Sequence, residues 1–166
     1  MKRRPRRIES EVAKHLSLFS SKYGLSPVER IPVLGRCGPD LTINELGLVI
    51  DVKSRLSAPK GWCVLPAGRV GEWGDLVAVR LGEIELLEEM GRVMPLYSST
   101  LVTRWFSHMD QWTQAHCPDG ITALVLHRPG LHVGNSTLVI KKEDRRKLYD
   151  RYHHHSIPTG LISCTV

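Results

Sequence analysis

Residues 39–54 read PDLTINELGLVIDVKS, and this stretch decides the fold. Residues 41–43 and 48–54 are mostly aliphatic, as strands of a sheet often are, and the polar connection between them has hairpin length and ends in Gly47. We therefore expect a β-hairpin. Its facing pairs follow from pairing Asn44 with Gly47 across the turn.

The expected register gives the hairpin one aliphatic face and one polar face. Leu41 then faces Ile50, whereas Asp40 faces Asp51 and Lys53 follows on the same side. Like charges that face each other across a hairpin are destabilising unless a cation or a function compensates. The polar face is therefore the candidate site.

The sequence around the hairpin indicates an α/β fold in a single domain, residues 1–166, with a flexible basic tip at residues 1–7. Three stretches have the apolar spacing or caps of helices: 8–23, 98–116 and 143–152. Three further stretches are short apolar runs typical of strands: 75–80, 121–127 and 136–140. We expect a central mixed sheet of about four or five strands flanked by helices, with residues 57–74 as a long loop rich in Gly, Pro and Trp.

Composition narrows the class of protein. The chain has 166 residues, 42% of them hydrophobic, and a formal net charge of +6, which suits one packed core and a polyanionic partner. No run approaches the roughly 18 apolar residues of a membrane span, and no apolar segment of a signal peptide follows the basic tip. The four cysteines show no CxxC spacing. Reduced thiols and an intracellular location are the expectation.

Two carboxylates and an ammonium group on one surface suit the hydrolysis of a phosphodiester. Mg²⁺ prefers carboxylate and water oxygens, and it is commonly held by one or two acidic side chains together with a substrate phosphate. A neighbouring lysine can orient or deprotonate water and stabilise negative charge at the phosphorus atom. Asp40, Asp51 and Lys53 meet these requirements.

Pro39-Asp40 followed by Asp51-Val52-Lys53 resembles the signature of the PD-(D/E)xK nuclease superfamily. The resemblance implies a restriction-endonuclease-like αβββαβ core, with the motif on a hairpin after a first helix. It covers residues 8–55 well and residues 98–140 loosely, and residues 57–96 have no counterpart that we can assign. The implied activity is that of an endonuclease that depends on Mg²⁺ or Mn²⁺ and cuts DNA.

Carried over by position, the resemblance assigns a role to each motif residue. Asp40 and Asp51 would be metal ligands, the backbone carbonyl of Val52 would complete the coordination, and Lys53 would be the catalytic lysine. Asp51 occupies a position where glutamate is frequent in the superfamily, which the pattern permits.

The first helix resembles that of the archaeal Holliday junction resolvases, which carry an acidic residue there. Glu9 is the better match, because it comes first and lies beside apolar residues, and Glu11 is the alternative. Structure-selective cleavage is therefore expected, and the sequence offers no helix-turn-helix or zinc finger that would read bases. Nucleases of this type often dimerise, and residues 101–112 are a candidate dimer face.

Several basic residues flank the motif in loops and are expected to contact DNA: Arg36, Arg55, Lys60, Arg69 and Arg128. Trp62 and Trp73 lie among them, where they either stack on distorted DNA or cover the core. His127 ends a strand and is either a substrate contact or a surface residue. The histidine run 153–155 reads as solvated and is left out of the site.

Three other interpretations stay open at this stage. One is a homing or restriction-type endonuclease with sequence specificity. Another is a catalytically inactive nucleic-acid-binding module with the same fold. In the third, the chain is an unrelated basic α/β protein in which Asp51 and Lys53 are only an ion pair on a strand.

Overall fold

The computed structural model describes residues 4–30, 38–88 and 92–154. The helices are α1 (Arg4–Lys22), α2 (Lys60–Cys63), α3 (Thr100–His116) and α4 (Arg145–His154). The strands are β1 (Glu29–Arg30), β2 (Leu41–Ile43), β3 (Leu48–Ser54), β4 (Val70–Trp73), β5 (Leu76–Arg80), β6 (Val93–Pro95), β7 (Ile121–His127) and β8 (Thr137–Lys141). Short 3-10 segments are η1 (Asn44–Leu46), η2 (Leu81–Glu88), η3 (Val133–Asn135) and η4 (Lys142–Asp144).

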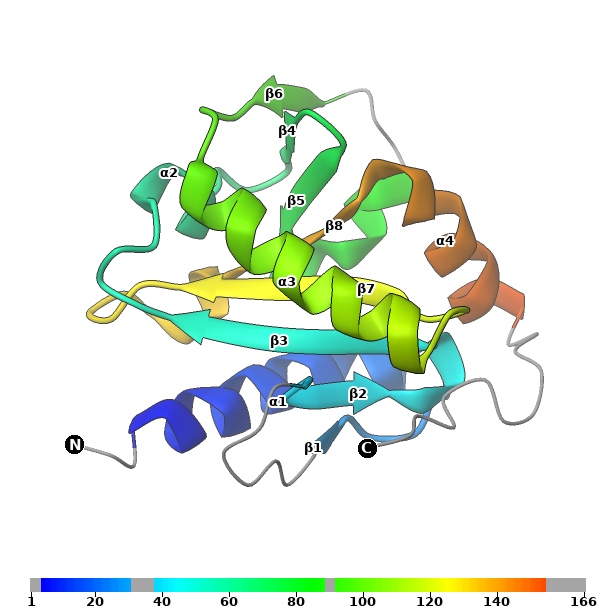
Figure 1. Cartoon of the computed structure of the whole chain (residues 1–166). Coiled ribbons are helices and arrows are strands. Elements are labelled where there is room, and N and C mark those ends of the chain that lie inside the picture. Colours follow the sequence, from blue (N-terminus) through cyan, green and yellow to red (C-terminus); the bar gives the residue numbers. More distant parts are fainter. Residues whose placement is uncertain (1–3, 31–37, 89–91, 155–166) are drawn as a thin grey trace.

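All strands in the described part of the chain join one mixed sheet with the order β1-β2-β3-β7-β8-β5-β4-β6 (Figure 1). The pairs β3–β7 and β4–β6 are parallel, and the other neighbouring pairs are antiparallel. The α/β class and the mixed sheet are confirmed. The expected four or five strands were too few, because β1, β4 and β6 are too short to show a clear alternating pattern.

The central hairpin has the predicted register. Leu41 faces Ile50 and Ile43 faces Leu48, and η1 forms the turn between the two strands. Gly47 ends this turn with a φ of 66°, a backbone conformation that costs glycine little and other residues more. The alternation of side chains along β3 is therefore fixed by both strand pairing and turn geometry.

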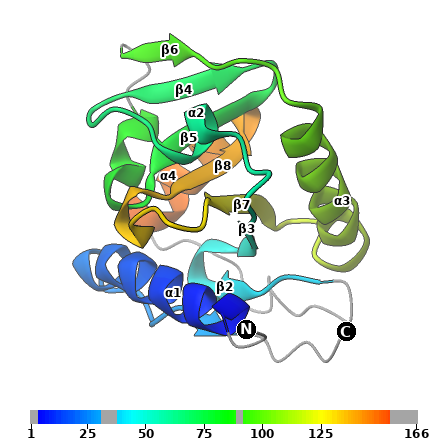
Figure 2. The same ribbon diagram turned by 90° about the vertical axis from the view of Figure 1, so that its left-hand side faces the viewer.

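Helices cover the two faces of the sheet, and each face has its own core (Figures 1 and 2). On one face, α1 and α4 contribute Val12, Leu16 and Tyr152 to a core that includes Ile50 and Val52. The opposite face is covered by α2 and α3, whose apolar residues pack on Leu124 and Leu126 of β7 and on Val139 of β8. Within the described ranges, no helix is both long and apolar enough to cross a membrane.

Residues 57–74 differ from the expected loop. They contain α2 and β4, and the core between the sheet and α2 includes the buried side chain of Trp62. β4 is held between β5 and β6, and a Cβ atom added to Gly71 would lie 2.6 Å from Cδ1 of Leu96. Gly71, one of the glycines that made this segment resemble a loop, is therefore explained by the close approach of the Leu96 side chain to the backbone of β4.

Candidate active site at the end of the hairpin

The acid pair, Asp40 and Asp51, lies where β2 begins beside β3. The amide of Asp40 donates to the carbonyl of Ile50 (2.8 Å), and Oδ2 of Asp40 accepts from the amide of Val52 (2.8 Å). The carboxyl groups of Asp40 and Asp51 also lie within hydrogen-bond reach of each other. The hairpin register thus brings together the two acids that the sequence predicts as metal ligands.

Lys53 completes this group, because it lies two residues after Asp51 on the same face of β3. Its Nζ is 3.5 Å from Oδ2 of Asp51, and the two side chains are 23% and 14% exposed. The ion pair of the third interpretation is therefore present. It is largely shielded from water, however, and the carboxyl group of Asp40 lies next to that of Asp51, which distinguishes it from an ordinary surface pair.

The environment makes it costly to ionise both acids at once. Burial raises the pKa of Asp51 to about 7, the attraction of Lys53 opposes this shift, and the charge and hydrogen bond of Asp40 add to it. The ammonium group of Lys53 therefore does not fully offset the burial of Asp51 beside a second carboxyl group. Additional positive charge at this position would favour the ionised form of Asp51.

The N–H and C=O groups of Val52 point to the side of β3 where Asp40 lies. In an extended strand, the N–H and the C=O of one residue point to the same side. The amide of Val52 donates to Asp40, so its carbonyl points to the same edge of β3, beyond the start of β2. This orientation agrees with the role expected for that carbonyl.

The first-helix acids make separate contacts. Glu9 Oε1 is 3.5 Å from Nη2 of Arg30 on β1, and Glu11 Oε2 is 3.5 Å from Nε of Arg7. Among the residues that the structure describes, no three His, Cys, Asp or Glu side chains converge as metal ligands. Neither Glu9 nor Glu11 therefore joins the acid pair as a third side-chain ligand in this conformation.

The basic residues predicted to contact DNA differ in exposure and in their distance from β3 along the sheet. Arg55 and Lys60 are exposed in the segment that leaves β3 for α2, and Arg128 is half-buried with Nη1 3.3 Å from the carbonyl of Ala58. Arg69 is exposed before β4, several strands away in the sheet order. Arg36 lies outside the described residues.

The tryptophans in this region pack inside the protein. Trp62 is 1% exposed, and its Nε1 donates to the carbonyl of Tyr97 (2.8 Å). Trp73 is half-buried and meets Trp62 edge to face, with 6.3 Å between ring centroids. The core interpretation of Trp62 is therefore correct, and this side chain does not present a stacking surface.

His127 faces inward and joins the ends of two strands. It is 3% exposed, and its Nδ1 is 2.7 Å from Oγ of Ser54 at the end of β3. Its Nε2 is 2.9 Å from the carbonyl of Leu131. A carbonyl only accepts, so Nε2 carries the proton and Nδ1 accepts from the serine hydroxyl. His127 therefore holds the strand that carries Lys53 in place, and the partnership with Ser54 was not visible in the sequence.

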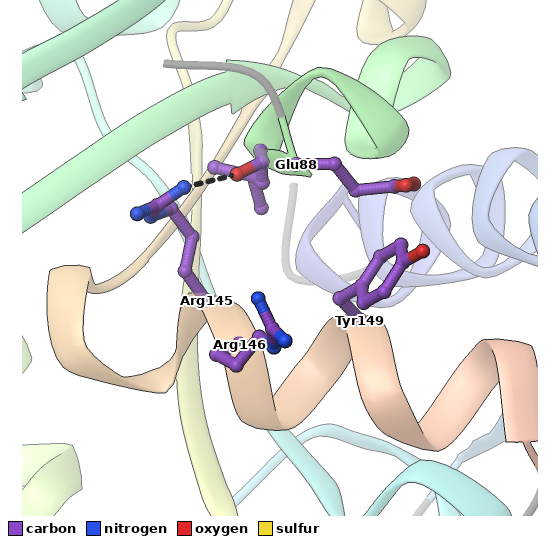
Figure 3. A pocket seen from close by; sticks show the side chains of 5 residues that line it. Glu88, Arg145, Arg146 and Tyr149 are labelled. Atoms are coloured by element: carbon purple, nitrogen blue, oxygen red, sulfur yellow. Dashed lines mark hydrogen bonds between the residues drawn. The ribbon is translucent and has the colours of Figure 1, made fainter.

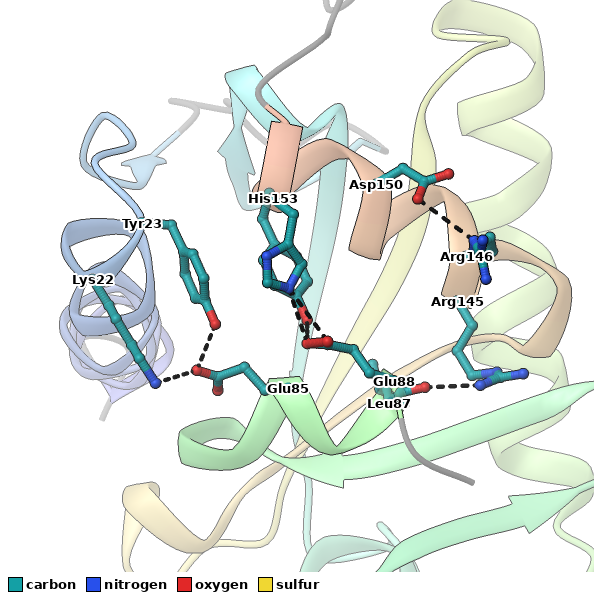
Figure 4. Close-up of polar contacts among 10 residues, drawn as sticks. Lys22, Tyr23, Glu85, Leu87, Glu88, Arg145, Arg146, Asp150 and His153 are labelled. Atoms are coloured by element: carbon teal, nitrogen blue, oxygen red, sulfur yellow. Dashed lines mark hydrogen bonds and ion pairs between the residues drawn. The ribbon is translucent and has the colours of Figure 1, made fainter. Parts of the chain in front are cut away.

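A second group of acids, the η2 acid cluster, consists of Glu85 and Glu88 with their donors (Figure 4). Glu85 accepts from Nζ of Lys22 and from the hydroxyl of Tyr23, which is 3.0 Å away. Glu88 accepts from the hydroxyl of Tyr152. Partial burial alone would raise the pKa of Glu85, but the hydrogen bonds of Lys22 and Tyr23 outweigh it and lower the pKa.

Beside this cluster lies a pocket of about 420 Å³ between η2 and α4 (Figure 3). Its lining residues are Leu87, Glu88, Arg145, Arg146 and Tyr149. Arg145 donates from Nη1 to the carbonyl of Leu87 (2.9 Å), which ties α4 to η2. None of the residues expected to act in catalysis lines this pocket.

Comparison of the chain with protein families, curated proteins and solved structures finds no match.

Proposed function

We propose that this protein is a metal-dependent DNA endonuclease whose catalytic residues are Asp40, Asp51 and Lys53. The observation that carries the proposal is the convergence of two shielded carboxyl groups and one ammonium group at the end of the central hairpin. Two facing acids, of which Asp51 has a raised pKa, are a cost to the fold without a further cation, and such a cost is typical of functional sites.

The order of the elements supports the proposal. α1 is followed by the antiparallel strands β1, β2 and β3, and later by α3 and by β7, which pairs parallel to β3. This order supports the αβββαβ core that the sequence resemblance implies, and that core is part of the proposal. The segment between β3 and α3 then acts as an insertion that contributes α2 and strands β4 to β6, and β8 extends the sheet.

The donor set suits Mg²⁺ or Mn²⁺. Asp40 and Asp51 would hold the ion together with the carbonyl of Val52, and substrate and water oxygens would complete the coordination. When bound, the ion supplies positive charge next to the phosphate and makes a nearby water molecule more acidic.

The side chains of the chain itself have separate tasks in this mechanism. Lys53 lies next to the acid pair, where its ammonium group can orient the attacking water and stabilise the negative charge that develops on the phosphate. Arg55 and Lys60 follow on the same chain segment and would grip the DNA backbone without reading its sequence. His127 acts as a positioning residue through Ser54.

DNA is preferred to RNA on the basis of the resemblance, and branched DNA is the first substrate to test. Two copies of the chain could cut two strands in one encounter with the DNA. The buried residues Val102, Phe106 and Met109 of α3 pack within the protein, so only the remaining surface of residues 101–112 is left for a dimer contact.

The deciding experiment incubates the purified protein with plasmid, single-stranded and four-way-junction DNA in the presence of Mg²⁺, Mn²⁺ or EDTA. Cleavage with metal that is lost in Asp40→Asn and Asp51→Asn, and retained in the exposed control Asp119→Asn, would support the proposal. Binding of intact DNA without cleavage would favour the inactive binding module. Cleavage of one linear sequence, with other branched substrates ignored, would favour a homing or restriction-type enzyme.

A further inference from the structure

We propose that the exposed side chains of Leu56 and Tyr97 form a stacking surface that receives unpaired nucleotides beside the acid pair. This inference rests on the proposed function, because it takes DNA as the partner. It names the part of the substrate that the protein recognises: a single-stranded segment next to the cut.

Tyr97 is presented outward from a fixed backbone. Its side chain is 89% exposed, whereas its carbonyl accepts from the buried indole of Trp62 (2.8 Å). Leu96 just before it is buried, and its amide donates to the carbonyl of Glu72 (2.9 Å). Because the backbone is held and a tyrosine side chain has only two rotatable bonds, stacking a base on the ring costs little conformational entropy.

Leu56 is placed next to the candidate active site. It is 70% exposed and follows β3 directly, in a turn where the amide of Arg55 donates to the carbonyl of His127 (3.1 Å). The amide of Ala58 closes the turn by donating to the carbonyl of Arg55 (3.1 Å). An exposed leucine is common on protein surfaces. Here, however, Leu56 lies in the chain between Lys53 and α2, and Trp62 of α2 is hydrogen-bonded to the backbone of Tyr97.

The two segments lie on one side of the molecule. Figure 2 faces the end of β3, α2 and the start of α3. In the chain, Leu56 follows the end of β3 and Tyr97 precedes the start of α3. The chain path from β3 to α2 and the path into α3 meet at the hydrogen bond between Trp62 and Tyr97. A strand cut at the acid pair could therefore continue over this side.

Charge on both segments favours a nucleic-acid strand over a protein partner. Residues 55–71 and 96–109 contain no Asp or Glu, and they include the exposed basic residues Arg55, Lys60, Arg69 and Arg104. Basic groups pair with phosphates, and the apolar side chains need an accessible base face. A duplex hides its base faces, so the surface suits an unpaired segment.

The test measures binding in EDTA, where a metal-dependent enzyme leaves its probe intact. The probes are a single-stranded oligonucleotide and a duplex of the same sequence, both with 2-aminopurine to report stacking. We expect Tyr97→Ala to weaken single-strand binding by roughly 5- to 100-fold and to reduce the change in 2-aminopurine fluorescence, with duplex binding nearly unchanged. Tyr97→Phe keeps the ring and should behave like the wild type.

Leu56→Ala should give a smaller loss of single-strand binding, and Leu18→Ala provides the matched control. Leu18 is 71% exposed, close to the 70% of Leu56, but it lies on α1 at the other face of the sheet. Equal single-strand affinity in wild type and Tyr97→Ala would overturn the inference even if DNA is cleaved. Loss of stacking in Tyr97→Ala in a protein that never cuts DNA would retain the inference and refute only the nuclease function.

Discussion

The acid pair and the η2 acid cluster both contain partly buried carboxyl groups, but the pKa shifts of Asp51 and Glu85 have opposite directions. In the cluster, Glu85 has an ammonium and a phenol as donors, and its pKa is lowered. In the acid pair, Asp51 faces another carboxyl group, and its pKa is raised to about 7 chiefly by burial. Lys22 and Tyr23 thus outweigh the burial of Glu85, whereas Lys53 does not outweigh the burial of Asp51 beside a second carboxyl group.

The difference separates carboxylates that stabilise the fold from carboxylates that need a ligand. The cluster joins α1, η2 and α4, so its hydrogen bonds contribute to holding these elements together. The acid pair joins only two strands that already pair through their backbones. Its geometry therefore contributes little to stability, and a role outside folding explains it better.

The largest expected effect comes from removing the cation of the acid pair. Lys53→Ala should lower the cleavage rate by at least about 100-fold, because general acid–base or charge stabilisation at the phosphate is lost. DNA affinity should stay nearly constant, since one lysine contributes little to a distributed phosphate contact. Single-turnover cleavage and a separate binding assay check both parts.

Lys22→Ala is the matched control for that experiment, because Lys22 is the ammonium partner in the η2 acid cluster. It should cleave DNA like the wild type. An equal loss of cleavage and binding in Lys53→Ala would contradict the catalytic role of Lys53.

The next largest effect concerns the stability of the metal-free protein. The folded-state pKa of Asp51 lies above its usual value, so the folded state binds more protons and its free energy of unfolding falls as pH rises from about 4 to about 7. Asp51→Asn removes this loss and should stabilise the apoprotein at pH 8 by roughly 1–3 kcal/mol. The advantage should disappear near pH 4, and urea unfolding at both pH values measures it. A variant less stable than the wild type at pH 8 would support a structural role.

In the η2 acid cluster, removal of a hydrogen-bond donor should destabilise the protein, whereas Asp51→Asn should stabilise it. Tyr152 is 2% exposed, and its hydroxyl donates to Glu88, so Tyr152→Phe should lower the free energy of unfolding by about 1–2 kcal/mol. Tyr97→Phe is the control, because the hydroxyl of that exposed residue should contribute nothing measurable. Thermal and urea unfolding of the two variants give the comparison, which fails if both variants match the wild type.

The smallest expected effect is that of Lys22→Ala on stability. The Lys22 side chain is 65% exposed, so its loss should cost only about 0.5 kcal/mol and the cost should vanish in high salt. Because the pKa of Glu85 is lowered in the folded state, its contribution is present above the usual glutamate pKa and is lost as pH falls through the folded value. Urea unfolding at low and high salt measures this difference, and a cost that salt leaves unchanged would speak against an ionic origin.

The sequence predicts the parts of this structure that depend on local patterns. The hairpin register follows from the turn and from the alternation of residues 48–54, and the meeting of Asp40, Asp51 and Lys53 follows from the register. The apolar spacing and an N-terminal serine cap predict a helix over residues 98–116, and in the structure the cap is Ser99, whose Oγ accepts from the amide of Val102.

The remainder depends on partners that are distant in the sequence. β6 has three residues and, among the residues that the structure describes, pairs with β4 alone, so neither its pattern nor its length marks it as a strand. The burial of Trp62 requires α3 and β8 to be in place, and nothing in its own segment shows this. The contact between Glu9 and Arg30 likewise joins α1 to β1, a short strand whose pairing the sequence did not predict.

The parallel pairing of β3 with β7 has a consequence for how the protein acquires its site. β3 is synthesised early, but β7 follows only after residues 57–96 and the whole of α3. Contacts between segments so far apart along the chain form late and slowly, because a long loop must close before they can form. During synthesis, the strand that carries Asp51 and Lys53 therefore keeps one edge unpaired until residues 121–127 have left the ribosome, and a truncated chain that ends before residue 121 would lack this neighbour.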